Sequence, residues 1–264
     1  MKYGCCVDAL ARTPDGAPVP NIEQLAELGY DYVELYLASL TALPEAEFQA
    51  VADRLGRAGI PCEACCIFYP RTVRLTGPDV NWAQVEDYDR RAIARAARLG
   101  AKVIVFGSSG AKNVPEGFPY DQAWQQIVHS MHIAAPIAAE HGVTIVIEPL
   151  NKKEANIVLN GAEGLKLAHE INRPSVQLLI DYYHMALEGE SPDILLEAGD
   201  AIRHTHISTA PARTYPVTVE PGFLPFFANL KAIGYQGRMS VEARTENFQA
   251  DAAAALKVLK QLGG

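Results

Sequence analysis

Residues 141–148 read HGVTIVIE, in which a glycine is followed by a short run of β-branched residues and then by a carboxylate. A glycine at the end of an amphipathic segment is typical of a helix C-terminus, and a run rich in Val and Ile predicts a buried strand. The same order of glycine and strand recurs at Gly29, Gly59, Gly100 and Gly234. The repeat indicates helices that alternate with parallel strands through right-handed crossovers.

Eight strands of this kind can be traced along the chain. We predict them at residues 3–7, 32–35, 62–67, 103–106, 144–148, 176–181, 202–207 and 238–241. Amphipathic segments such as 45–57, 82–99 and 121–141 predict helices between them. Eight units in 264 residues favour one α/β domain over residues 1–264, a single (β/α)8 TIM barrel. An open doubly wound sheet is the alternative, although no GxGxxG or P-loop motif follows any strand.

The charge and hydropathy of the chain argue against nucleic acid and membranes as binding partners. The formal net charge is -8 and the pI is near 5.4, whereas binding to nucleic acid draws its energy from clustered Lys and Arg. No apolar run approaches the length of a membrane span, and no export signal opens the sequence. We therefore expect a small polar substrate, no nucleic acid, no membrane association and a cytoplasmic location.

The five cysteines do not indicate a disulfide framework, because their number is odd and the chain is large. Cys62, Cys65 and Cys66 have a spacing that two zinc ligands could use. No second CxxC or paired histidine motif completes four ligands, so we expect reduced, half-buried thiols on a strand, with a structural zinc site as the alternative. Cys66 has the strand parity to line a pocket.

Polar side chains end the last four predicted strands, and in a barrel the chemistry belongs at the C-terminal ends of the strands. They are Glu148, Asp181, His206 and Glu242. Three carboxylates and a histidine at one mouth would repel one another without a cation, and mixed oxygen and nitrogen ligands suit Mn, Mg or Co, with Zn as a further option. The alternative is that each residue is an isolated polar group bound to backbone amides or to a lysine.

The second half of the chain carries four short motifs. They are Glu148-Pro149-Leu150-Asn151 with Glu154, Asp181 with His184, His204-x-His206 with Arg213, and Val241-Glu242. Together they resemble the xylose-isomerase-like family of TIM-barrel sugar isomerases and epimerases, closest to its ketose 3-epimerase branch, which includes D-tagatose and D-psicose 3-epimerases. The resemblance covers most of the chain in architecture, and it implies a homodimer or homotetramer.

The resemblance also implies a role for each matching residue. The ligands of one divalent ion, Mn²⁺ first, would be Glu148, Asp181, His206 and Glu242. Two of them, Glu148 and Glu242, would also act as the catalytic acid and base. The residues that contact the substrate would be Glu154, His184 and Arg213. Cys66 is added to the pocket wall from its strand parity, not from the resemblance. The loop from His206 to Arg213 is one residue longer here than in the family pattern.

This layout has a physical reason of its own. Removing a proton from a carbon next to a carbonyl builds negative charge on the carbonyl oxygen, and a divalent metal stabilises the resulting enediolate. Inversion at that carbon needs a second acid on the other face of the planar intermediate. We therefore predict a metal-dependent sugar isomerase or epimerase, most simply one that epimerises a ketose at C3.

Several other polar residues have less specific interpretations. We expect His204 to be packed behind His206, and Glu34 either to point into the mouth or to pair with a lysine. His184 could equally orient a ligand instead of meeting the substrate. Residues 106–110 read FGSSG and predict a flexible loop. The helical histidines are expected at the surface or in packing contacts, and they are His129, His132, His141 and His169.

Three other functions use related features. A lyase or dehydratase acting on an inosose, on dehydroshikimate or on an oxidised C-glycoside would share the same enolate. A DNA-repair endonuclease would need extra histidines at the ends of the third and fourth strands, where the sequence has Ile67-Phe68-Tyr69 and Phe106-Gly107-Ser108. A binding or scaffold subunit would retain a metal for stability alone.

Overall fold

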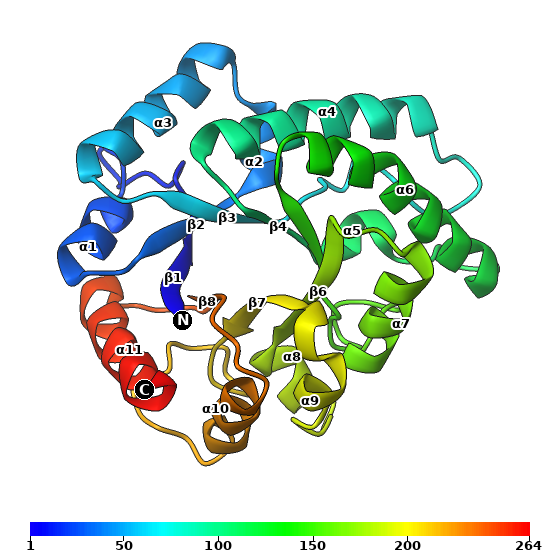
Figure 1. Cartoon of the computed structure of the whole chain (residues 1–264). Coiled ribbons are helices and arrows are strands. Elements are labelled where there is room, and N and C mark those ends of the chain that lie inside the picture. Colours follow the sequence, from blue (N-terminus) through cyan, green and yellow to red (C-terminus); the bar gives the residue numbers. More distant parts are fainter.

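Eight short apolar runs form the strands in the computed structural model, which describes all residues from 1 to 264. The strands are β1 (Lys2–Val7), β2 (Tyr32–Tyr36), β3 (Cys62–Cys66), β4 (Val103–Phe106), β5 (Thr144–Ile147), β6 (Val176–Asp181), β7 (Ile202–Ile207) and β8 (Arg238–Val241). Each pairs in parallel with the next, and β8 pairs with β1 (Figure 1). The predicted (β/α)8 barrel is confirmed, and the open doubly wound sheet is wrong.

Helices surround the barrel (Figure 1). They are α1 (Asn21–Leu28), α2 (Leu37–Ala42), α3 (Glu45–Ala58), α4 (Trp82–Leu99), α5 (Ser109–Lys112), α6 (Tyr120–Glu140), α7 (Gly161–Ile171), α8 (Tyr182–Leu187), α9 (Ile194–Ala198), α10 (Phe223–Ala232) and α11 (Phe248–Gly263), with a 3-10 turn at Gly199–Ala201. None has the combination of length and apolar character that crossing a bilayer requires.

Glycines at the C-terminal ends of the helices explain how the chain turns back into the barrel. Gly29, Gly59 and Gly100 cap α1, α3 and α4 with φ angles of 81°, 70° and 96°. Residues with a Cβ adopt this left-handed conformation only at a cost, so glycine ends the helix and redirects the chain. Gly142 and Gly234 also have positive φ, at 64° and 67°.

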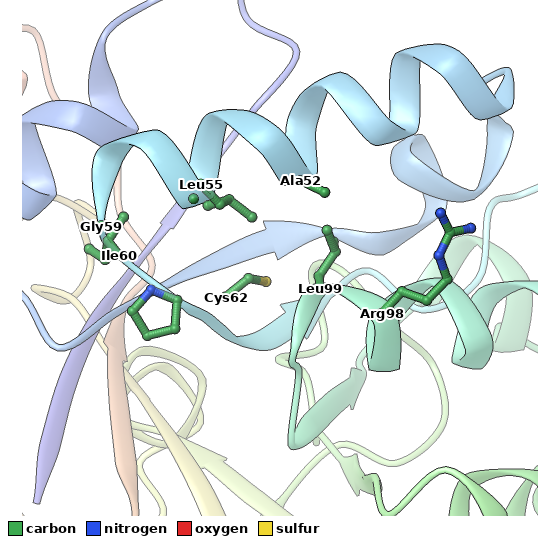
Figure 2. A pocket seen from close by; sticks show the side chains of 9 residues that line it. Ala52, Leu55, Gly59, Ile60, Cys62, Arg98 and Leu99 are labelled. Carbon is green, nitrogen blue, oxygen red and sulfur yellow. The ribbon is translucent and has the colours of Figure 1, made fainter.

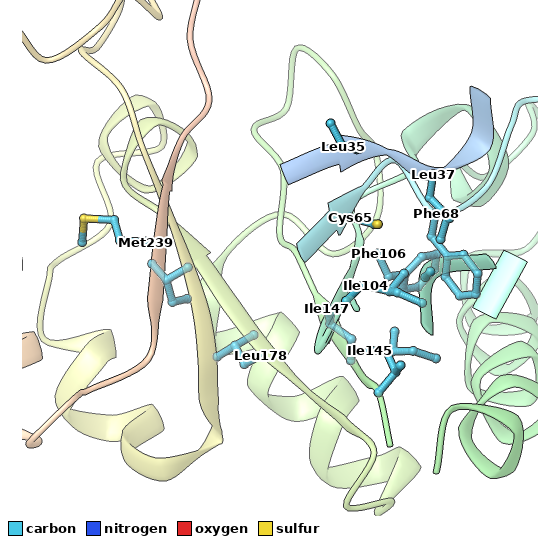
Figure 3. Close-up of a cluster of buried hydrophobic side chains, with 14 of the residues drawn as sticks. Leu35, Leu37, Cys65, Phe68, Ile104, Phe106, Ile145, Ile147, Leu178 and Met239 are labelled. Atoms are coloured by element: carbon cyan, nitrogen blue, oxygen red, sulfur yellow. The ribbon is translucent and has the colours of Figure 1, made fainter. Parts of the chain in front are cut away.

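Strand side chains alternate between two apolar layers. The outer layer packs against the helices, and Figure 3 shows part of it with Leu35, Ile104 and Phe106. The inner layer is a separate cluster of eight buried residues, namely Cys6, Tyr32, Ala64, Cys66, Val103, Val105, Val146 and Leu179. Burial of each large apolar side chain contributes about 1.5–3 kcal/mol. Inward positions nearer the strand C-termini are polar, and this is where the barrel can hold a site.

Three local expectations differ from the structure. β3 ends at Cys66, because Ile67 has a φ of 52° and is 42% exposed. β5 ends at Ile147, so Glu148 follows the strand, although its amide still donates to the carbonyl oxygen of Phe106. Of residues 106–110, which were expected to form a flexible loop, Phe106 ends β4, and Ser109 and Gly110 already belong to the short helix α5.

Candidate metal and substrate site

Four polar side chains meet where β5, β6, β7 and β8 end. One ligand atom from each of Glu148, Asp181, His206 and Glu242 lies within 4.8 Å of the other three. Asp181 is directly opposite His206 in the register, and β7 and β8 are paired at Ile207 and Val241. Since the barrel makes these strands consecutive neighbours, residues almost a hundred positions apart in the sequence reach one point.

His206 is at the centre of the cluster and uses both ring nitrogens. Nδ1 lies 3.2 Å from Oε1 of Glu148 and 3.3 Å from Oε2 of Glu242. Nε2 lies 3.0 Å from Oε1 of Glu34, which is fully buried. The other oxygen of Glu34 is 2.8 Å from Nε2 of His204. The expected packed position of His204 is confirmed, and Glu34 pairs with two histidines, not with a lysine.

Burial and mutual repulsion shift the ionisation of the cluster. The pKa of Asp181 is raised to about 7 by burial, against the attraction of His206, with Glu242 and Glu148 adding repulsion. Burial also raises the pKa of Glu148. Burial would raise the pKa of Glu242 as well, but His206 and Arg213 together hold it at about 2. Two of the three carboxyl groups thus hold a proton more tightly than usual, as expected where acidic groups are crowded in a buried site.

These residues fit a divalent cation. Oδ2 of Asp181 is buried and has no hydrogen-bond partner, which normally costs about 1–3 kcal/mol. The donor set is three carboxylates and one imidazole, which suits Mn²⁺, Co²⁺ or Mg²⁺ better than a sulfur-seeking ion. The ligand roles of Glu148, Asp181, His206 and Glu242 stay predictions that this geometry supports.

A cavity of about 420 Å³ opens above the cluster. All the side chains predicted to contact substrate line it, and these are Cys66, Glu154, His184 and Arg213. The cavity is also lined by the two predicted catalytic residues, Glu148 and Glu242. Tyr69 and Arg71, which the strand pattern did not single out because they follow β3 in a loop, complete part of the wall.

Arg213 links the two sides of this cavity. Its Nη1 lies 3.1 Å from Oε1 of Glu154, and its Nη2 donates to Oε2 of Glu242 at 2.7 Å. The guanidinium also lies over the ring of Tyr183, 4.6 Å from the centroid. This side chain can therefore hold the carboxylate of Glu242, which is predicted to be catalytic, while presenting positive charge to the cavity.

His184 is buried and faces Asp181. Its Nδ1 accepts from the backbone amide of Asn151 at 3.2 Å, and Nε2 is 3.6 Å from Oδ2 of Asp181 without a hydrogen-bond partner. Burial, assisted by Arg213, lowers the pKa of His184 to about 3. The ring is therefore neutral, and with Nδ1 as acceptor its proton is on Nε2, next to the cluster.

Lys112 is a further buried residue beneath the site. It is fully buried, and its Nζ donates to the backbone carbonyl oxygen of Glu148 at 3.0 Å. Burial lowers its pKa to about 8. Sequence patterns do not reveal this residue, because it follows Gly110 in a short helix outside every strand and its partner is a backbone atom far along the chain.

The cysteines do not form the zinc site considered for Cys62, Cys65 and Cys66. All five are free and buried, and Cys62, Cys65 and Cys66 are not half-buried as expected. The sulfurs of Cys62 and Cys65 are 3.8 Å apart and pack in the outer layer, whereas Cys66 points into the barrel. A structural zinc site on these three residues is therefore wrong.

A second cavity, of about 340 Å³, lies between α3 and α4 (Figure 2). It is beside Ile60 and Cys62, at the N-terminal end of β3 and away from the mouth. Its walls hold one ionisable cation, Arg98, but no carboxylate or histidine. Apart from the single thiol of Cys62, this cavity lacks groups for acid–base or metal chemistry. The expected surface positions of the helical histidines are confirmed, since His129, His132, His141 and His169 are exposed.

The fold and the site define a class, that of (β/α)8-barrel proteins with a carboxylate and histidine centre at the C-terminal mouth. The chain belongs to the family described as xylose isomerase-like TIM barrel, whose model matches residues 22–262. The resemblance read from the sequence motifs is thereby confirmed.

Similar proteins include several named sugar epimerases. L-ribulose 3-epimerase of Methylomonas sp. (strain DH-1) is 38% identical over 117 residues, which are 44% of this chain and 41% of that protein. The chain thus spans less than half the length of this relative. The 3-dehydro-D-guloside 4-epimerase of Escherichia coli is 27% identical over 83% of this chain and 84% of its own length.

A solved structure has the same fold over nearly the whole chain. The crystal structure of D-allulose 3-epimerase from Methylomonas sp., in complex with D-allulose, superposes with a TM-score of 0.85 at 26% identity. The match covers 99% of this chain and 96% of that chain. The barrel fold is therefore shared with a protein whose crystal structure contains a bound sugar.

Proposed function

We propose that this chain is an isomerase that moves a proton at a carbon next to a carbonyl group, with C3 epimerisation of a ketose as its reaction. The observation that carries the proposal is the position of Glu148 and Glu242, both within 3.3 Å of Nδ1 of His206. They come from the ends of β5 and β8, which are not neighbours in the barrel. Two carboxylates that reach one cavity from separate strands suit removal and return of a proton on opposite faces.

We also propose that Glu148, Asp181, His206 and Glu242 hold one divalent ion, with Mn²⁺ first and Mg²⁺, Co²⁺ or Zn²⁺ as alternatives. When bound, such an ion supplies positive charge that stabilises negative charge on the oxygens of the deprotonated substrate. The unpartnered Oδ2 of Asp181 supports this assignment.

The remaining residues bind and orient the substrate. Arg213 holds Glu242 through Nη2 and turns Nη1 toward Glu154, so both carboxylates are fixed before a substrate arrives. Neutral His184 can donate from Nε2 to a substrate oxygen. Cys66 offers an apolar wall. The cavity of about 420 Å³ has the size for one small sugar or hydroxycarbonyl compound.

Two substrate classes are supported by the names of relatives. One is a free ketose, as the names L-ribulose 3-epimerase and D-allulose 3-epimerase indicate. The other is an oxidised glycoside, because the 3-dehydro-D-guloside 4-epimerase matches over 83% of this chain. Both require a proton to move next to a carbonyl.

Exchange with heavy water tests the proposal. The protein is incubated in deuterated buffer with a panel of ketoses, 3-oxo-glycosides and inososes, with added Mn²⁺ and with chelator. We expect deuterium at the carbon that is inverted, only when metal is present. Glu242→Gln should lower the rate about 10²–10⁴-fold, whereas exposed Glu246→Gln should not. No exchange across the panel would remove the epimerase proposal.

Product analysis separates the related reactions. A lyase or dehydratase would expel a β leaving group and form an unsaturated product, whereas an epimerase returns an isomer of equal mass. A scaffold subunit would show neither reaction. Loss of exchange in Glu242→Gln with metal content and folding unchanged would argue against the scaffold.

A further inference from the structure

Two thiols line the barrel interior beside the carboxylate cluster. Cys6 comes from β1 and Cys66 from β3, and both belong to the inner layer. A sulfur from each and a carboxylate oxygen of Glu242 lie within 4.8 Å of one another. Only β2 separates the two strands, so closure of the barrel brings these sulfurs together next to β8.

We propose that Cys6, Cys66 and Glu242 form a second metal site, which takes thiophilic ions such as Zn²⁺ or Cd²⁺ and shares Glu242 with the carboxylate cluster. Two thiolates and one carboxylate supply three of the four ligands of a tetrahedral zinc site and leave one position open. Oxygen-seeking ions such as Mn²⁺ and Mg²⁺ have little affinity for sulfur. The two neighbouring sites therefore select different ions.

The geometry of Glu242 allows it to be shared. Its hydrogen bond to Arg213 and its ion pair with His206 both use Oε2, and Oε1 makes no hydrogen bond in the structure. A carboxylate can bridge two ions with one oxygen on each. With Oε2 engaged by the carboxylate cluster and Oε1 on the second ion, Glu242 would have no free oxygen left to accept a proton from a substrate.

The position of Cys6 gives further support to the second metal site. Its sulfur also belongs to a group with Glu34 and His206 whose ligand atoms lie within 4.8 Å of one another. An ion on Cys6 is thus surrounded by negative or electron-donating groups from four strands. Cys6 is 7% and Cys66 2% exposed, so a bound ion would be largely shielded from water. Binding releases the two thiol protons, since the thiolate is the ligand.

The other cysteines provide an internal control. Cys62 and Cys65 have sulfurs 3.8 Å apart in the outer layer, but no carboxylate or imidazole joins them in a group of three ligands. Cys5 also faces outward, with its sulfur 3.0 Å from the hydroxyl of Tyr215. A measurement that distinguishes inner from outer thiols therefore tests the proposed site directly.

Titration of the whole protein with Cd²⁺, in the presence of saturating Mn²⁺, is the experiment. We expect one Cd²⁺ per chain and the ultraviolet thiolate-to-metal charge-transfer band. Cys66→Ser and Cys6→Ser should each weaken the binding about tenfold or more and reduce the band, whereas Cys62→Ser should retain both. The proposal is overturned if the band is absent from the wild type, if both inner variants retain it, or if Cys62→Ser alone loses it. Circular dichroism checks folding. If a serine variant does not fold, the alanine variant at the same position replaces it.

A second readout measures inhibition. The deuterium exchange rate of each protein with Cd²⁺ is divided by its own rate without Cd²⁺, so that differences in basal activity cancel. We expect strong inhibition of the wild type and of Cys62→Ser, and resistance in Cys6→Ser. Equal inhibition of all three would contradict the shared role of Glu242. The spectral titration needs no turnover, so it remains decisive even if the proposed reaction is not found.

Discussion

Oε1 of Glu34 lies 3.0 Å from Nε2 of His206, on the opposite side of the ring from the nitrogen that faces Glu148 and Glu242. This contact decides how the ring can act. When Nε2 donates its proton to Glu34, Nδ1 is left with a free lone pair that points into the cluster. Glu34 also accepts from Oγ of Ser240 at 2.5 Å, so its carboxylate is fixed. The fully buried Glu34 thereby orients the predicted metal ligand His206, although Glu34 is not itself one of the four predicted ligands.

Glu34→Gln should weaken Mn²⁺ binding about 10–100-fold. The amide keeps the shape but offers only one acceptor oxygen in place of two, so His204, His206 and Ser240 cannot all be satisfied. Calorimetric titration with Mn²⁺ measures the effect. Glu86→Gln is the control, because Glu86 is an exposed partner of Arg90 on α4. Equal affinity in wild type and Glu34→Gln would show that the contact does not orient His206.

Gly107→Ala should disturb the site without unfolding the barrel. A Cβ at Gly107 would lie 2.1 Å from Oε2 of Glu148, so the carboxylate must move away. We expect Mn²⁺ affinity and the deuterium exchange rate to fall about tenfold or more, because a displaced Glu148 carboxylate can no longer meet the ion or the substrate in the required geometry. Gly56→Ala is matched to it, because nothing lies within 4 Å of a Cβ there and α3 should gain about 0.5–1 kcal/mol. An unperturbed Gly107→Ala would mean that Glu148 does not need its observed position.

Metal should stabilise the folded chain. Mn²⁺ at about 100 times its Kd should add about 2.7 kcal/mol to the free energy of unfolding, because the ion binds only where the carboxylates are assembled. Thermal unfolding with Mn²⁺ and with chelator measures the difference. Asp181→Asn should abolish most of it, since one buried anionic ligand is lost. A wild-type Tm that is identical with and without Mn²⁺ would contradict the proposed ion site.

Asp89 should make stability depend on pH. It is fully buried on α4, and burial raises its pKa from 3.8 to about 8, against the lowering influence of the nearby Tyr69 hydroxyl. Between these values the unfolded chain has lost a proton that the folded chain keeps, so stability falls as pH rises, by at most about 1.4 kcal/mol per pH unit, and levels off above pH 8.

Asp89→Asn should remove this contribution. The stability of the variant relative to wild type should rise steadily from pH 5 to pH 8, because the amide carries no charge to bury. Chemical unfolding at several pH values gives the difference. Asp87→Asn, on the exposed side of α4, should leave the pH dependence as it is. A constant difference between Asp89→Asn and wild type would show that Asp89 is ionised in the folded protein.

Much of the barrel could be predicted because its signals are local. Helix ends are marked by glycines such as Gly59 and Gly100, and strands by short β-branched runs, since both depend on a few adjacent φ and ψ angles and on side-chain alternation. Family motifs then placed Glu148 and His206 at one mouth. The single-domain organisation, the cytoplasmic location and the homodimer or homotetramer stay predictions.

Contacts across the barrel interior were beyond the reach of sequence patterns. The sequence left open whether Glu34 points into the mouth and gave no role to Cys6. It could not show that Glu34 meets His206 from the opposite wall or that Cys6 meets Cys66. No sequence pattern indicated that Lys112 is buried beneath the site. Such partners depend on strand register and on closure between β1 and β8. Both are set by packing of residues far apart in the sequence, since the paired residues Lys2 and Arg238 are 236 positions apart. The chain's local pattern therefore specified the strands and their polar ends, and only the closed barrel decided which of those ends touch.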